Sequence, residues 1–131
     1  VEIWYLPKLH KKDRVLIQKG GEFGLAVSKY GYLQAFVGVD AQRVAIAMTD
    51  AAIPEGRWSK LALLWDGAAL TILVNDHPLA RKAGKATLAM SDSPLEIGTK
   101  DMPLDGFVDE ARVDALIEDS RMVLRDNLTC Y

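Results

Sequence analysis

Apolar and polar side chains alternate in short runs along most of the first 113 residues. Phe23, Leu25 and Val27, for example, alternate with the small residues Gly24 and Ala26. A period of two places successive side chains on opposite faces of a strand, so the pattern predicts strands rather than helices. The strands expected on this basis cover residues 2–6, 15–19, 23–28, 32–38, 44–48, 58–65, 70–74, 95–98 and 106–113.

Turn-forming residues separate these runs, at positions 20–21, 30–31 and 75–76 among others. Asp66-Gly67 is the strongest hairpin signal, because both residues tolerate the positive φ that a two-residue turn requires. Residues 21–38 likewise predict a hairpin. Short strands with a turn roughly every 8–12 residues indicate an all-β sandwich or barrel.

The period changes only near the end of the chain. Between residues 114 and 124, Leu116, Ile117, Ser120 and Leu124 share one face of a helical wheel. This spacing predicts a short C-terminal helix.

Length and composition limit the class of protein. The 131 residues suit one domain, which we expect to be a piece of a longer protein because it begins at Val1 within a strand pattern. A net charge of -2 removes the main electrostatic argument for a nucleic-acid partner. No apolar run approaches the roughly 18–20 residues that span a bilayer. The single cysteine, Cys130, excludes a disulfide framework within the chain and leaves a free thiol or a bridge to another segment.

No catalytic motif is present, and we therefore expect a protein that is not an enzyme. Glycosidases of the sandwich class use acids that alternate as Glu-x-Asp-x-x-Glu so that all point into one cleft. Here Asp105 and Asp109 share one face, whereas Glu110 shares the other with Val108 and Arg112. That arrangement favours a structural ion pair between Glu110 and Arg112. There is also no Gly-x-Ser-x-Gly nucleophile elbow.

Two sets of residues are candidates for binding chemistry. Acidic residues at the expected turns could supply the oxygen ligands that calcium prefers, and the candidates are Asp40, Asp101 and Asp105. A basic stretch from residue 8 to 14, which includes Lys11 and Arg14, is either a solvated loop or a site for sulfated or uronic polysaccharide.

Several motifs in order resemble those of laminin G-like and pentraxin-like domains, which have the concanavalin A-like fold. The motifs are Gly56-Arg-Trp58, Trp65-Asp66-Gly67, Leu70-Thr-Ile72, Val74-Asn75, Leu95-Glu-Ile-Gly98 and the run Asp105-Gly-Phe-Val-Asp-Glu-Ala-Arg-Val113. The resemblance covers nearly the whole chain, so residues 1–131 are expected to form a single domain. It implies a jelly-roll β-sandwich of two antiparallel sheets, an extracellular or cell-surface location, and a module that binds carbohydrate or a glycosylated surface.

We assign expected roles to individual residues on this basis. The candidate ligand-binding residues are Tyr30, Tyr32, Gln34, Lys11 and Arg14. The residues expected in the structural core are Trp4, Trp58, Trp65, Phe107, Glu110 and Arg112.

The chain departs from the family pattern in two respects, and both bear on its function. Asp76 replaces the usual glycine of a turn, which is therefore expected to be altered. The strand that normally precedes Ile3-Trp4 is missing, which predicts an exposed edge unless a missing segment, a second copy or the C-terminal helix covers it. A protein–protein adhesion or assembly module, and an accessory domain of a polysaccharide-degrading enzyme, are the alternative functions. Asn127 begins an N-glycosylation pattern.

Overall fold

The structure is a computed structural model. It describes residues 1–9, 11–20, 22–39, 42–86, 93–98, 106–113 and 128–130. Eleven strands lie within these residues. In chain order they are β1 (Glu2–Pro7), β2 (Arg14–Lys19), β3 (Phe23–Val27), β4 (Leu33–Val39), β5 (Gln42–Ala47), β6 (Ser59–Trp65), β7 (Ala69–Val74), β8 (His77–Ala83), β9 (Leu95–Ile97), β10 (Gly106–Arg112) and β11 (Leu128–Cys130).

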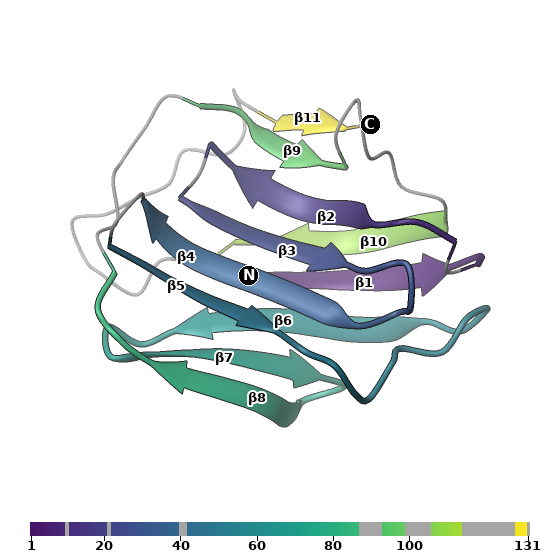
Figure 1. Cartoon of the computed structure of the whole chain (residues 1–131). Coiled ribbons are helices and arrows are strands. Elements are labelled where there is room, and N and C mark those ends of the chain that lie inside the picture. Colours follow the sequence, from purple (N-terminus) through teal and green to yellow (C-terminus); the bar gives the residue numbers. More distant parts are fainter. Residues whose placement is uncertain are drawn as a thin grey trace.

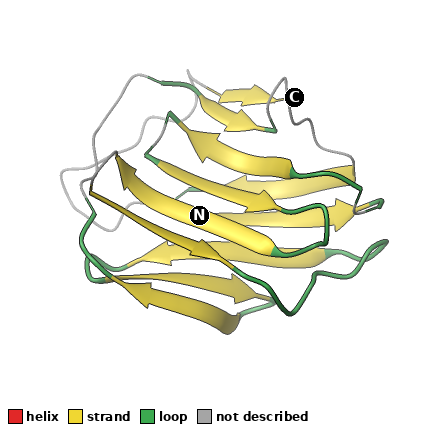
Figure 2. Ribbon diagram, viewed as in Figure 1, coloured by secondary structure: helices red, strands yellow, loops and turns green. Residues whose placement is uncertain are grey.

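The strands form two sheets that pack face to face (Figure 1). A five-stranded sheet has the order β10-β1-β6-β7-β8, and all of its pairs are antiparallel. A six-stranded sheet has the order β11-β9-β2-β3-β4-β5 and is antiparallel except where β11 pairs with β9 in parallel. Figure 2 shows strands and loops without a helix in the described part of the chain. The helix expected at residues 114–124 lies outside the described residues.

The core lies between the two sheets and takes every second side chain from the strands that face it. Ile3 and Tyr5 of β1 and Leu61 of β6 are fully buried on the inner face of one sheet. Ile17 of β2 and Leu25 of β3 are buried on the inner face of the other. Burying a side chain of this size contributes about 1.5–3 kcal/mol, so this shared core holds the sheets together.

The expected hairpin between β6 and β7 is confirmed, but its turn is not the expected two-residue form at Asp66-Gly67. Trp65 pairs with Leu70, so four residues separate the paired positions, and Asp66 does not have a positive φ. Gly67 has a φ of 91°, and the Asp66 carboxylate accepts hydrogen bonds of 2.8 Å from the backbone N–H groups of Ala68 and Ala69. These bonds, that of Ala68 first, favour the charged carboxylate and lower the pKa of Asp66 below its ordinary value. The hairpin expected within residues 21–38 is likewise confirmed as β3 and β4.

The turn at Asn75-Asp76 keeps a two-residue form even though Asp76 replaces glycine. Val74 pairs with His77, and the two residues between them have φ values of 50° and 68°. Asn75 Oδ1 accepts a 2.9 Å hydrogen bond from the backbone N–H of Lys60, and the Lys60 ammonium contacts the Asp76 carboxylate at 2.8 Å. The strand β8 that follows this turn was not expected from the sequence pattern.

Trp58 does not lie in the core, which corrects the expectation from the sequence. Ser59 pairs with Tyr5 and points inward, so the preceding residue Trp58 points outward and is 47% exposed. Trp65 is half-buried and packs against the core, as expected. Trp4 was also expected in the core, but it lies between the buried Ile3 and Tyr5 on β1, so it faces outward and is half-buried there. The core is therefore built mainly from aliphatic side chains.

Three core expectations on β10 are also wrong. Val108 pairs with Tyr5 and packs against the core, so its neighbour Phe107 points outward and is 56% exposed. Glu110 and Arg112 are exposed as well. For Glu110 and Arg112 there is a register irregularity opposite β1, where Glu110 has a φ of 48° and the regular alternation is interrupted.

Candidate functional site

The outer face of the six-stranded sheet carries a groove of about 700 Å³ across β2, β3, β4 and β5. Two cross-strand rows form its floor, and in each row neighbouring residues pair between adjacent strands. The rows are Gly24–Phe36–Ala45 and Ala26–Gln34–Ala47. Four of these six residues are glycine or alanine, so the floor is low and the hollow remains open to solvent.

Phe36 is the aromatic residue of the groove, and its position depends on Gly24. A Cβ atom added at Gly24 would lie 2.3 Å from Phe36 Cε1, so the ring occupies the space that a side chain would need. The Arg43 guanidinium lies over the same ring, with its central carbon 4.3 Å from the ring centroid. Arg43 Nε also donates to the Gly38 carbonyl oxygen at 3.4 Å. The ring and the guanidinium therefore form a stacked pair.

Two glutamines place amide groups beside this pair. Gln34 is exposed in the middle of the groove. Gln18 is half-buried on β2, and its Nε2 donates to Glu96 Oε1 at 3.3 Å. An amide both donates and accepts hydrogen bonds, so these side chains suit a ligand that is rich in hydroxyl groups.

Charged groups lie at opposite ends of the groove. Asp13 lies at the β2 end, where its Oδ1 accepts a 2.8 Å hydrogen bond from the backbone N–H of Lys29. Arg43 and Lys82 lie at the β5 end, and Lys82 reaches the groove from β8 of the other sheet. The ends are separated by three strand spacings, or about 14 Å.

Of the residues expected to bind a ligand, Gln34 and Arg14 line the groove. Tyr30 and Tyr32 lie at the β3–β4 turn, with ring centroids 6.3 Å apart, and neither is a lining residue. Tyr30 is 65% exposed, whereas Tyr32 packs against the core. The tyrosine pair is therefore outside the groove that contains Gln34.

Arg14 does not belong to a solvated basic loop, which corrects the expectation from the sequence. Its side chain is buried at 1% exposure and donates to Tyr5 Oη at 3.3 Å and to the Leu9 carbonyl oxygen. Lys11 remains exposed in the loop between β1 and β2. Arg14 therefore connects the loop to the interior of the sandwich.

Four lining residues were not predicted from the sequence as binding residues: Phe36, Arg43, Gln18 and Lys82. A signal for the groove was nevertheless present in the sequence. The outward positions of β3 and β5, which lie on either side of β4, carry Gly24, Ala26, Ala45 and Ala47, where a solvated sheet face usually carries long polar side chains. Recognising that signal requires knowing which strands are neighbours.

The calcium candidates Asp40, Asp101 and Asp105 lie outside the described residues. Within the described ranges, no group of three or more His, Cys, Asp or Glu side chains is placed to hold a metal ion. The described part of the chain contains no helix that is long and apolar enough to cross a membrane.

Comparison with known families connects this fold to a group of proteins. Residues 1–119 match the laminin G-like model of the concanavalin A-like lectin/glucanases superfamily. The chain belongs to this superfamily. Its jelly-roll fold agrees with the two packed sheets, and such laminin G-like domains are generally non-catalytic binding modules that are commonly extracellular. A comparison with curated proteins found no match.

Proposed function

We propose that this protein is a non-catalytic, extracellular module that binds carbohydrate in the groove across β2 to β5. The observation that supports the proposal most strongly is the groove itself, in which an aromatic ring and two amide side chains lie among small residues. Its volume falls in the range of ligand sites in general, about 300–1,000 Å³.

The chemistry of the lining suits a sugar. The Phe36–Arg43 pair offers a planar surface against which the C–H face of a pyranose ring can pack. Gln18 and Gln34 can exchange hydrogen bonds with hydroxyl groups, which both donate and accept. The groove runs across several strands and is open at its surface, so it suits a chain of sugars more than a single enclosed one.

A glycan array probed with the purified domain tests the proposal. We expect wild type to bind a subset of oligosaccharides and Gln34→Ala to weaken that binding about tenfold, because the amide's hydrogen bonds to the sugar are lost. Thr71→Ala is the matched control, because Thr71 lies on the outer face of the five-stranded sheet, away from the groove. The proposal is contradicted if wild type binds no glycan on the array, or if Gln34→Ala binds as tightly as wild type.

The same array also tests the calcium prediction for Asp40, Asp101 and Asp105 when it is run in calcium and again in EDTA. Calcium would bridge carboxylate oxygens and sugar hydroxyls, since it accepts six to eight oxygen ligands. Binding that EDTA abolishes supports a calcium site formed by these residues. Binding that EDTA leaves unchanged contradicts it.

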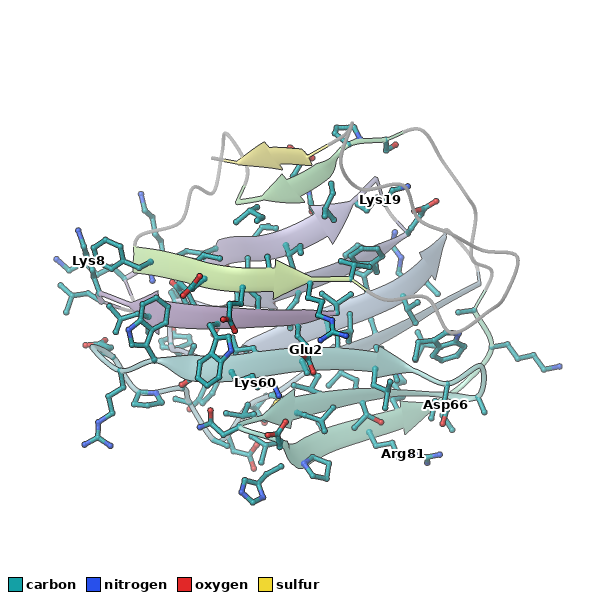
Figure 3. The ribbon with its side chains drawn as sticks, turned by 180° about the vertical axis from the view of Figure 1, so that it is seen from behind. Glu2, Lys8, Lys19, Lys60, Asp66 and Arg81 are labelled. Atoms are coloured by element: carbon teal, nitrogen blue, oxygen red, sulfur yellow. The ribbon has the colours of Figure 1, made fainter. Side chains whose placement is uncertain are left out.

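Assembly is the second candidate function, and a specific surface favours it. Phe107 of the edge strand β10 pairs with Leu6 of β1, and Trp58 directly precedes Ser59, which pairs with Tyr5 of the same strand; both aromatic side chains are exposed. The Lys8 ammonium lies 5.6 Å from the Phe107 ring centroid (Figure 3 shows this face). Two large exposed aromatics beside an edge strand could seat a second copy of the chain.

Sedimentation velocity separates this candidate from the first. If the surface is an assembly site, wild type forms a dimer and the double variant Trp58→Ser/Phe107→Ser is a monomer. A monomeric wild type contradicts assembly of identical copies and leaves carbohydrate binding unaffected.

A further inference from the structure

We infer that one end of the sandwich binds the surface of a phospholipid membrane that carries acidic headgroups. The residues that form this surface, which we call the basic end, are Lys8, Leu9, Lys11, Lys12, Trp58 and Phe107. They do not line the groove. The inference therefore concerns a second surface and does not rest on the proposed carbohydrate function.

Three separate segments of the chain meet at the basic end, around Pro7. Pro7 of β1 pairs with Gly106 of β10, which places the adjacent Phe107 there. The Gly56 backbone N–H donates to the Pro7 carbonyl oxygen at 2.8 Å, so the loop that precedes β6 reaches the same place. The loop that begins at Lys8 follows Pro7 directly, and Figure 3 shows Lys8 at this end of the molecule.

Large apolar side chains are exposed at the basic end. Leu9 is 45% exposed, and Trp58 and Phe107 are exposed to a similar degree. Six large hydrophobic side chains are exposed in the described part of the chain, and these three are half of them. Such side chains are stabilised at the boundary between lipid headgroups and acyl chains, and tryptophan is enriched there.

Positive charge surrounds these apolar side chains. The exposed cations in the three segments are Lys8, Lys11, Lys12 and Arg57. The Lys8 ammonium lies 5.6 Å from the Phe107 ring centroid, so charge and apolar surface are adjacent. Asp13 and Glu55 are the acidic side chains in the described parts of the same loops, so cations outnumber acids by four to two. This charge is complementary to an acidic membrane surface.

A membrane uses both properties of the basic end. A sulfated glycan or an acidic peptide would pair with the ammonium groups but would not require three exposed apolar side chains from separate segments. A second copy of the chain would cover Trp58 and Phe107, but a two-fold contact uses the same surface on both copies and would bring identical cations together. Acidic headgroups and acyl chains together match the cations and the apolar side chains.

Co-sedimentation of the purified domain with lipid vesicles tests the inference. The vesicles contain phosphatidylcholine alone, or phosphatidylcholine and phosphatidylserine at about two to one. We expect wild type to bind the phosphatidylserine vesicles at least about tenfold more tightly, a preference that falls as salt is added. Tryptophan emission should shift to the blue on binding, and Trp58→Phe should lose most of that shift because it removes the indole of the basic end.

Two sets of variants separate the contribution of charge from that of apolar contact. Lys11→Gln and Lys12→Gln should each weaken binding to phosphatidylserine vesicles about fivefold. The double variant Leu9→Ser/Phe107→Ser keeps every cation and should weaken the same binding at least about tenfold.

Matched controls come from the opposite edge of the five-stranded sheet. Lys82→Gln and Leu79→Ser change exposed residues of β8, whereas Phe107 lies on β10 at the other edge. Both controls should bind vesicles as wild type does. Gln34→Ala in the groove should also bind vesicles as wild type does, so the results for membrane and glycan are independent. Circular dichroism checks that each variant is folded.

The inference is overturned if wild type does not bind phosphatidylserine vesicles or binds both kinds of vesicle equally. Binding that depends on Lys11 and Lys12 but is unchanged in Leu9→Ser/Phe107→Ser also overturns it, because the surface then recognises negative charge alone, as a site for an acidic glycan or peptide would. A wild-type dimer in sedimentation velocity that Trp58→Ser/Phe107→Ser abolishes overturns it as well, because a second copy then covers the basic end.

Discussion

Individual side chains in this sandwich are placed by their neighbours across the strands, and Phe36 shows the effect most clearly. Its ring lies where a side chain on the facing residue, Gly24, would otherwise stand. Gly24 lies in a regular strand and does not have a positive φ. Glycine is therefore needed at this position because it has no side chain, which leaves room for the Phe36 ring, and not because of its backbone freedom. The Phe36–Arg43 stack, and with it one wall of the groove, depends on that space.

Gly24→Ala should therefore destabilise the protein even though alanine suits a strand better than glycine does. The new methyl group would clash with the Phe36 ring, and overpacking of this kind costs about 1–3 kcal/mol. Urea unfolding followed by tryptophan fluorescence measures the change. In the double variant Gly24→Ala/Phe36→Ala the two costs should be less than additive, and strict additivity would contradict the contact.

The positions of individual side chains, in the core or at the surface, were the feature that the sequence predicted least well. Alternation shows that a strand has two faces, but it does not show which face meets the second sheet. Trp58 and Phe107 were assigned to the core for their size, whereas the register places Ser59 and Val108 inward instead. Arg14 was assigned to the surface for its charge, and the structure buries it against Tyr5.

Elements were predicted better, because strand periods and turn chemistry are local properties. The hairpins at Asp66-Gly67 and within residues 21–38 follow from neighbouring residues alone. Strand β8 was missed because its side chains are mostly exposed on both faces and show little alternation. Strand β11 pairs in parallel with β9, a distant partner that local pattern cannot identify.

The Asp66 turn predicts a pH dependence of stability. The backbone N–H groups of Ala68 and Ala69 lower the pKa of the folded carboxyl, so the folded state binds a proton less readily than the unfolded state. The resulting stabilisation is fully present above the unfolded pKa and is lost as the pH falls through the folded pKa. Asp66→Asn cannot titrate, so the stability difference between wild type and this variant should shrink in that acidic window.

Urea unfolding at a series of pH values from about 6 to about 2 measures this difference. A difference that stays constant over the series would contradict the role of the charged carboxylate. Amide protection at Ala68 and Ala69, which is the exchange rate corrected for the intrinsic pH dependence of amide exchange, should fall over the same interval and reports the turn directly.

The Asn75-Asp76 turn predicts a difference between two substitutions at one position. Asp76→Ala and Asp76→Gly both remove the carboxylate that contacts Lys60. They differ in how well the new residue tolerates the φ of 68°. Asp76→Gly should be more stable than Asp76→Ala by about 1 kcal/mol in urea unfolding. Equal stabilities would show that the turn relaxes to another conformation.

At the scale of the whole molecule, the groove arises from strands that are neighbours in the sheet but are spread along the chain. It spans β2 to β5, and Lys82 reaches it from β8 of the other sheet. The sequence predicted the fold class, which the family match confirms, because that depends on many local signals together. It placed Gln34 and Arg14 among the binding residues but gave no reason to join them to Phe36 and Arg43, since that requires the strand order.

The central claim is that ligand binds in this groove, and one comparison tests it most directly. Ala45→Trp places an indole on the exposed floor of the groove, and Leu64→Trp places the same group on the exposed outer face of the five-stranded sheet. Both variants and wild type are probed on one glycan array after circular dichroism shows that they are folded. We predict that wild type and Leu64→Trp bind the same glycans and that Ala45→Trp binds them at least about tenfold more weakly. Equal binding by Ala45→Trp, or loss of binding only in Leu64→Trp, would contradict the claim.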